Sequence, residues 1–574
     1  MATTLATTRA DFWARHAERQ HRTSILGLGS PKRRRCLRWS GTLIACLLGL
    51  AASPGHAQLT YPAIGGGGVA GYGGPNTAPT IPAIGPAGVT FGVRPRPFAL
   101  SIGVVGTFTN NVNLQPSGQE KSDFVLNFIP QVALNYQGAH AYLTGYAALP
   151  IVLYTRETDN DQAYPSVGLF GRVEALERFF YIEGSVSVTQ EYFSPFGGQP
   201  IGLVNASANR YTSATYQVSP YIQGVTPSDI RYSLRDNNLW FTTYHAPPNT
   251  ANSYYNQLLG NIASPVAPWG WALDYEGDWT KFEGQPTLVS NLVRGRVLYQ
   301  LDPQIQLTGS GGYEDNRYTF TDYRGPIYGA GLKWTPSPRT NLVAFWEHRF
   351  FGPSYLFTFD THGPLSALSL HASRNITSYP QQLLTVPATG NVAQLLTSIF
   401  SSRFTDPTQL QSFVNGLIQD RGLPNQLTGP VTLYTQQILL VEDLRATVGL
   451  LGARNSVFLT AFYVDSEPIA GSGTPLPPAL AFNNNNTQKG VAATWTHNIS
   501  PAVTLNASLT LLRTTANPPL VGTTNQGILN VTVYRQVAAE TQIFGGARYQ
   551  KLNSDLATNY TEAAIFAGFY HTFR

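Results

Sequence analysis

The segment Glu562-Ala-Ala-Ile-Phe-Ala-Gly-Phe-Tyr-His-Thr-Phe-Arg574 ends the chain. Its odd-numbered residues from Ala563 to Phe573 are apolar apart from His571, so one face of a strand here would be apolar and end in an aromatic residue. No later segment can pair with this strand, and the first strand is the partner that leaves no open edge. The sequence therefore predicts a closed β-barrel whose lipid face carries the odd-numbered residues of this strand.

From Phe98 onward the chain repeats segments of about ten residues in which apolar residues alternate with polar or small ones. Between Val503 and Leu511, for example, every second residue is apolar and those between are Thr504, Asn506, Ser508 and Thr510. This second face is too polar for a protein core. Short connections such as 301–304 also alternate with longer ones such as 193–210 and 470–486. We therefore predict an all-β fold, a transmembrane antiparallel up-and-down barrel in residues 97–574, with about 22 strands in a range of 16–22 and its short turns in the periplasm.

One segment, about residues 388–425, breaks the alternation. Val392, Leu395, Leu396, Ile399 and Phe400 have helical spacing, and Asp406-Pro407 precedes a second apolar helical face that runs from Leu410 to Ile418. We expect a helical hairpin in a long outer loop. It would act either as a lid on the rim of the barrel or as a constriction inside its lumen.

The composition supports an exported membrane barrel. Charged residues are 12 % of the chain and aromatic residues 12 %, with 54 Gly and 40 Pro. Nine of the 37 basic and two of the 32 acidic residues lie in 1–57, which leaves 28 basic and 30 acidic residues and a net charge of −2. Nucleic acid is therefore not an expected partner. Both cysteines, Cys36 and Cys46, also lie in 1–57, so the rest of the chain has no thiolate for a metal site.

Residues 1–57 have the pattern of a secretory signal with an extended N-region. Lys32 to Arg35 form a basic segment, residues 42–52 an apolar segment, and Gly55-His56-Ala57 a cleavage site. The apolar run of about 11 residues is shorter than the roughly 20 that a membrane helix requires. Residues 58–96 are dominated by Gly, Pro, Ala and Thr, which predicts a flexible periplasmic linker too short to fold into the plug of an energy-driven transporter.

Several stretches resemble the outer-membrane β-barrel proteins associated with exosortase/PEP-CTERM systems, which overlap the β-barrel porin 2 family. They are Thr107–Val112, Ser122–Phe124, Ser194–Gly197, Gly311–Asn316, Trp346–Gly352 with Tyr355, and the helical segment. The resemblance implies an outer-membrane barrel in Gram-negative bacteria that make exopolysaccharide. It also implies a role in exporting polysaccharide or envelope components, with polysaccharide-export components as partners. It implies no catalytic residues.

The chain after residue 57 contains no HExxH, no GxSxG, no Walker loop and no Cys/His cluster. We therefore predict no catalytic, cofactor-binding or metal-binding residues, and no enzyme activity. The functional candidates are charged residues at inward positions, because a charge that faces lipid is costly. They are Glu183, Glu191, Arg294, Arg296, Glu314 and Arg548. They would either brace the wall by pairing across strands or set ion selectivity.

The end of the last strand is also the predicted assembly signal, made of Gly568, Phe569, His571 and Phe573. The expected partners are outer-membrane lipid and lipopolysaccharide, and the barrel-assembly machinery. The leading function from these observations is a non-enzymatic outer-membrane channel that serves export. A general diffusion porin and a structural or adhesive surface protein are the alternatives.

Overall fold

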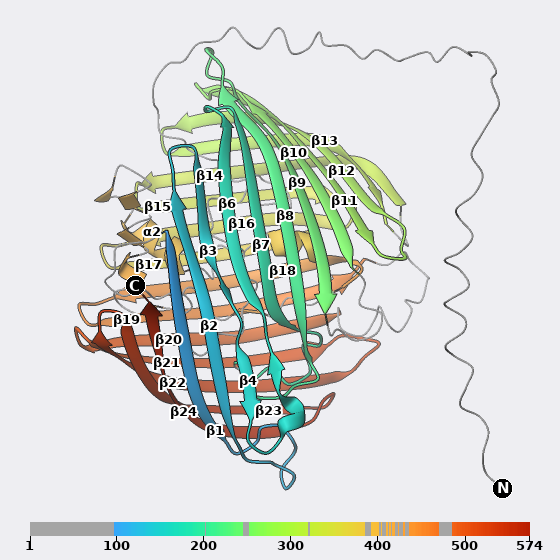
Figure 1. Ribbon diagram of the computed structural model, residues 1–574. Helices are drawn as coiled ribbons and strands as arrows, with labels where there is room; N and C mark the ends of the chain where they lie inside the picture. The colour runs from blue at the N-terminus through green and yellow to red at the C-terminus, as the bar shows by residue number, and fades with distance from the viewer. Residues whose placement is uncertain are drawn as a thin grey trace, which may run out of the picture. The chain divides into compact units, whose positions relative to one another are not determined.

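The alternating segments form one antiparallel sheet that closes on itself (Figure 1). The computed structural model describes residues 97–573 apart from 201, 245–251, 319–321, 385–391, 470–484 and most of 401–434, and all described residues belong to the unit Thr60–Arg574. The leader and the linker lie outside the described residues. β1 (Phe98–Thr109) pairs with β2 (Asp123–Gln137) on one side and with β24 (Tyr560–Phe573) on the other. Pairing of the first strand with the last confirms the closed barrel predicted from the terminal segment.

The remaining elements follow in chain order. They are β3 (Ala141–Ala148), β4 (Ile151–Tyr154), η1 (Thr158–Asn160), β5 (Gln162–Ala163), β6 (Ser166–Leu176), β7 (Phe180–Tyr192), β8 (Arg210–Val225), β9 (Arg231–Tyr244), β10 (Ser253–Ala263), β11 (Trp269–Phe282), β12 (Leu288–Asp302), β13 (Ile305–Arg317), β14 (Asp322–Ser337), β15 (Thr340–Arg349), β16 (Gly352–His362), β17 (Ser366–Ser378), α1 (Tyr379–Leu384), α2 (Val392–Phe400), β18 (Ile438–Leu451), β19 (Asn455–Pro468), β20 (Asn486–Ser500), β21 (Val503–Ala516), β22 (Gly522–Ala538) and β23 (Thr541–Ser554).

The wall has 22 strands, because two of them are interrupted. β2 pairs with both β3 and β4, while β3 pairs with β6 and β4 with β5. Pro150 separates β3 from β4 and Pro165 separates β5 from β6, and a proline has no N–H to donate to the ladder. β3 with β4, and β5 with β6, are therefore single strands of the wall. This agrees with the predicted number.

Burial alternates along the strands as the pattern requires. In β24 the outward side chains of Ile565 and Phe569 are 63 % and 40 % exposed, whereas Glu562 between β23 and β1 is fully buried. The odd-numbered residues of β24 therefore face outward, as predicted. No helix among the described residues has both the length and the apolar character needed to cross a bilayer.

The connections differ between the two ends of the barrel. At one end, which we call the short-turn end, ten connections of two to five residues join strands, and β1 begins and β24 ends there. At the other, the long-loop end, lie residues 379–437 (the insert), the longest connection, and residues 193–209 (loop 193–209). An even number of strands brings both chain ends to the same side.

The insert contains helix, as predicted. α2 (Val392–Phe400) is the first predicted helix, and residues 409, 410, 413, 414 and 416–418 are helical where the second was expected. The predicted cap Asp406-Pro407 and the end near Gly422 lie outside the described residues. The short helix α1 was not predicted.

Candidate functional site in the barrel lumen

Two ion pairs on the inner wall link β15 to β12 and to β13. Arg294 donates from Nε and Nη2 to the two carboxylate oxygens of Glu347, at 2.7 and 2.6 Å. Arg349 donates from Nε and Nη2 to Oε2 of Glu314, at 3.0 and 2.7 Å. All four residues are at most 5 % exposed. Paired guanidinium and carboxylate groups of this kind form strong hydrogen bonds and fix the spacing of the strands that carry them.

The other predicted inward charges are also paired, with one exception. Arg296 donates from Nη2 to Oδ1 of Asp274 at 2.7 Å, and Glu183 is bound by Arg235. Glu191 is buried and accepts a hydrogen bond from the Thr189 hydroxyl at 3.0 Å. Among the described residues Glu191 takes part in no ion pair.

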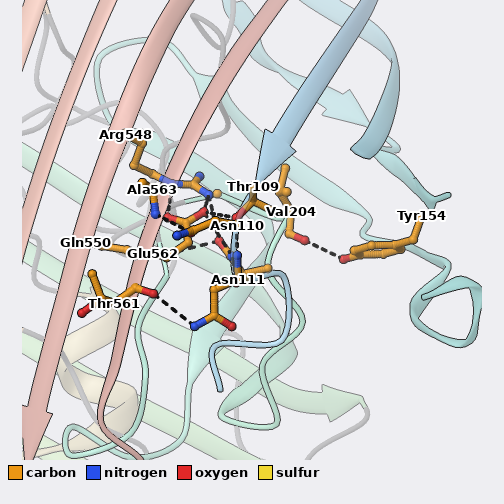
Figure 2. Close-up of polar contacts among 12 residues, drawn as sticks. Thr109, Asn110, Asn111, Tyr154, Val204, Arg548, Gln550, Thr561, Glu562 and Ala563 are labelled. Atoms are coloured by element: carbon orange, nitrogen blue, oxygen red, sulfur yellow. Dashed lines mark hydrogen bonds and ion pairs between the residues drawn. The ribbon is translucent and has the colours of Figure 1, made fainter. Parts of the chain in front are cut away.

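Arg548 and Glu562 form the most deeply buried ion pair, on neighbouring strands β23 and β24 (Figure 2). The guanidinium Nη2 lies 2.7 Å from Oε1 of Glu562, and that oxygen also accepts from the Thr109 hydroxyl of β1 at 2.7 Å. Nη2 also donates to the side-chain oxygen of Asn205 at 2.9 Å. The pair therefore joins the closing seam of the barrel to loop 193–209.

Loop 193–209 folds inward across the long-loop end. Its backbone carbonyls at Gln199 and Phe196 accept hydrogen bonds from Gln526 and Thr524 of β22, at 2.9 and 3.4 Å. Val204 is also buried, and its carbonyl accepts from the Tyr154 hydroxyl at 2.8 Å (Figure 2). The loop leaves the wall at β7 and reaches β22 to β24, so its described part crosses the lumen.

The insert also lies inside the barrel. At the long-loop end, the fully buried Tyr379 of α1 packs edge-on against Phe241 of β9, with ring centroids 5.1 Å apart, and beside Tyr255 of β10. β10 is seven strands from β17 along the sheet. α1 therefore connects distant parts of the inner wall.

The helix α2 lies towards the opposite end. Its buried face packs on Ala367, Leu451 and Phe458, which stand at inward positions beside the short turns of β17, β18 and β19. Arg403 donates to the carbonyl of Pro364 in the turn between β16 and β17, at 3.3 Å. The insert therefore begins at the long-loop end and reaches the short-turn end through the lumen. This arrangement favours the constriction over the rim lid.

A polar pocket lies between α1 and the wall. It is lined by acidic Glu276 and Asp278 of β11, Tyr318, Arg349 and, from α1, Gln381. Asp278 accepts hydrogen bonds from the hydroxyl of Tyr255 and from Gln257. The described residues contain no group of three or more His, Cys, Asp or Glu suited to a metal ion.

The predicted site residues thus share the inner wall, but their partners were not predicted. The missed residues are Asp274, Arg235, Glu347, Arg349 and Glu562. All stand at the inward parity that identified the predicted ones, so the parity rule could have found them. The pairing favours the bracing role. The selectivity role is untested.

Neutralising Arg294 and Arg296 as Gln is expected to leave the reversal potential of any pore current unchanged, because both guanidinium groups are buried against carboxylates. Reversal potential in a salt gradient measures this directly. A shift towards cation preference would place these residues on the ion path and contradict bracing. The Arg324→Gln variant, at an exposed pair, serves as the control.

The predicted assembly residues lie at the short-turn end of β24. Phe573 pairs with Leu100 of β1 and is 50 % exposed, and the His571 ring packs on Phe573 with centroids 4.9 Å apart. Phe569 also faces outward. At Gly568 an added Cβ would lie 2.4 Å from the carbonyl oxygen of Val104, so only glycine allows this approach of β24 to β1.

Their role in assembly remains a prediction. Phe573→Ala is expected to lower the amount of folded barrel in the membrane several-fold, whereas removal of Arg574 leaves it unchanged. Heat-modifiable migration of membrane fractions on gels measures folded barrel. The opposite ranking of the two variants would mean that Phe573 is not the recognised aromatic.

Comparison with known proteins identifies no family for this chain. No protein-family model and no curated protein matches this chain. The FrpB iron transporter from Neisseria meningitidis is 7% identical over 84% of this chain and 82% of that chain, with a TM-score of 0.44. The siderophore receptor PirA from Pseudomonas aeruginosa is 9% identical over 84% and 82%, with a TM-score of 0.39. OmpT, an outer membrane protein of Vibrio cholerae, is 7% identical over 84% and 99%, with a TM-score of 0.29. These scores are too low to carry an argument about function, and the resemblance to exosortase-associated barrels remains a prediction.

Proposed function

We propose that this protein is an outer-membrane channel whose own inward-folded segments close it. The observation that carries the proposal is the course of the insert, from α1 beside Phe241 at the long-loop end to Arg403 beside Pro364 at the short-turn end. Loop 193–209 occupies the long-loop end as well. Passage through the lumen requires these segments to move.

The orientation follows from general rules of outer-membrane barrels. Short turns and both chain ends lie on the periplasmic side in such proteins. The short-turn end, where β1 begins and β24 ends, would then face the periplasm. The predicted secretory signal agrees with this location. α2 would then close the periplasmic mouth, within reach of a periplasmic partner.

Exopolysaccharide or another envelope component is the substrate class that we propose. Support comes from the lumen, whose inward side chains are largely hydroxyl and amide groups such as Thr447, Thr460, Gln488, Thr510 and Gln526. Most inward charges there neutralise one another in ion pairs. Neutral hydroxyl and amide groups suit a polyhydroxylated chain better than a strongly charged one.

Planar-bilayer recording of the purified protein tests the proposal. We expect a low resting conductance with brief large openings, and block of the open state by neutral oligosaccharides at the concentration at which sulfated ones have little effect. A steady open current without block would indicate a general diffusion porin. Absence of conductance from the intact protein and from variants that lack the insert would indicate a structural or adhesive protein.

A further inference from the structure

A polar cluster stands on the outward face of the barrel, where the surroundings are apolar. The cluster consists of Asp236 and Asn238 of β9 with Tyr254 and Asn256 of β10. Outward positions on β9 are even-numbered, because Asn237, Leu239 and Phe241 are buried in the lumen while Leu234 and Trp240 are 45 % and 42 % exposed. Asp236 and Asn238 therefore face the membrane.

The depth of the cluster follows from its place along β9. Asp236 lies four residues from Tyr232, the aromatic residue near the short-turn end of the strand. At about 3.4 Å per residue and a tilt of about 40°, this is about 10 Å, well inside an apolar band about 25 Å tall. Trp240 lies on the far side of the cluster. The carboxylate thus stands between two aromatic positions, in the hydrocarbon layer.

The side chains of the cluster are bonded to one another. The Asn238 amide donates to Oδ2 of Asp236 at 2.8 Å, and the Asn256 amide donates to Oδ1 at 2.6 Å. The Tyr254 hydroxyl donates to Oδ1 of Asn238 at 2.6 Å. Tyr254 also packs on Trp240, with ring centroids 5.4 Å apart. The cluster is therefore an ordered surface of the wall.

These bonds leave the cluster incomplete. Asp236 forms no ion pair with any described residue, and no described donor bonds to the side-chain oxygen of Asn256. Lipid tails cannot supply a cation or a donor. Polar groups within a membrane usually face another protein surface, where amide and carboxylate side chains hydrogen-bond across the contact.

We propose that this face of β9 and β10 is an interface within the membrane between two copies of this chain. The partner must itself present donors and acceptors within the hydrocarbon layer. Carboxamides are both, so the cluster is complementary to itself: the Asn238 amide, which uses one of its two hydrogens on Asp236 of its own chain, can donate the other to Asp236 or Asn256 of the second copy. Closed homo-oligomers are the commonest assemblies built from one such patch.

The neighbouring outward residues suit such a contact. Leu258 stands opposite Asp236 in the ladder, and Val218 opposite Asn238. On β11 the outward position opposite Leu258 is Gly277, and the ring of Trp279 and the hydroxyl of Tyr275 lie over it. Apolar side chains around a polar centre would pack between the two barrels.

Cysteine cross-linking tests the interface in intact membranes, because both natural cysteines lie within the first 57 residues. In a background with Cys36→Ser and Cys46→Ser, a Leu258→Cys variant treated with a bismaleimide is expected to give a product of twice the chain mass. The control is Leu529→Cys, an outward residue of β22, which is ten strands from β10 by the shorter way around the barrel. It is expected to give none.

A second measurement uses Asp236→Leu combined with Asn238→Leu and Asn256→Leu. Native mass spectrometry in detergent is expected to give two or more copies for the natural chain and a single copy for this variant, with heat-modifiable migration showing that the barrel has folded. A single copy of the natural chain together with no cross-link at Leu258 would overturn the proposal. A cross-link at Leu258 to a different protein would also overturn it. If the triple variant fails to fold, the presence or absence of the Leu258→Cys cross-link between two copies decides whether the interface exists.

Discussion

Deletion of residues 388–425 is expected to raise the single-channel conductance by about tenfold or more, because a barrel of 22 strands encloses a wide lumen that only inward-folded segments can close. The deletion removes α2, whose apolar face covers Ala367, Leu451 and Phe458 beside the short turns. It leaves α1 in place on Phe241 and Tyr255. The long-loop end therefore keeps part of its closure while the short-turn end opens.

A point variant tests whether displacing α2 from the wall, without deleting residues 388–425, is enough to open the channel. Leu396 of α2 is fully buried in the cluster against the wall, so Leu396→Asp places a carboxylate where it has no water. We expect it to release α2 and increase the frequency of openings. The matched control is Thr397→Asp on the same helix, at a half-buried residue whose hydroxyl donates to the Ala393 carbonyl.

Planar-bilayer recording measures both effects, and heat-modifiable migration confirms that the variants fold. Unchanged conductance in the deletion and in Leu396→Asp would show that α2 does not block the path. Loop 193–209 would then be the next candidate. An equal effect of Leu396→Asp and Thr397→Asp would mean that added charge, rather than the seating of α2, changes the current.

The sequence predicts the strands of the barrel wall better than it predicts the segments and ion pairs inside the lumen. Alternation in segments such as β24 identifies the lipid face residue by residue, because a strand between lipid and a polar lumen has no other way to place Ile565 and Glu562. The number of strands also follows from this pattern. Pro150 and Pro165 interrupt two strands without changing the count.

The position of the insert could not be predicted in the same way. The helical spacing of Val392, Leu396 and Ile399 shows that one face is apolar, but the spacing does not say which surface covers it. A partial signal does exist on the wall. Phe458 stands at an inward position between Ser456 and Thr460, where a polar residue is expected. Its side chain packs against the apolar face of α2. α1 has only six residues, too few to show a helical period.

The charge partners were missed because they depend on contacts between strands that are distant in sequence. Arg294 and Glu347 are 53 residues apart and lie three strands from each other. Alternation places each of them inside the barrel. Whether the two side chains come within hydrogen-bond distance depends on the relative register of the four strands β12 to β15 and on the tilt of the strands.

Loss of Arg548 is the second change for which we expect a large effect. Arg548→Leu leaves the fully buried carboxylate of Glu562 without its cation, and removing one member of a buried pair typically costs about 3–5 kcal/mol. The matched control is Arg324→Leu, since Arg324 pairs with Asp315 at an exposed position where a pair contributes about 1 kcal/mol or less. Urea unfolding in lipid vesicles, followed by tryptophan fluorescence, measures the free energy of unfolding of each variant.

The double variant Arg548→Leu with Glu562→Leu completes a cycle. Replacing both charges removes the unpaired carboxylate, so we expect it to cost less than Arg548→Leu alone. If Arg548→Leu lowers the free energy of unfolding by no more than Arg324→Leu does, the pair does not brace the seam between β23, β24 and β1.

The same pair also holds loop 193–209, and Asn205→Ala separates the two roles. This substitution keeps the ion pair of Arg548 with Glu562 but removes the side-chain oxygen that accepts from the guanidinium, and the amide that donates to the Asn111 carbonyl. We expect more frequent openings with a loss of stability smaller than that of Arg548→Leu. If Asn205→Ala lowers stability as much as Arg548→Leu and leaves the current unchanged, the contact supports the wall alone. If it increases the openings, the seam that closes the barrel also holds the loop that closes its lumen.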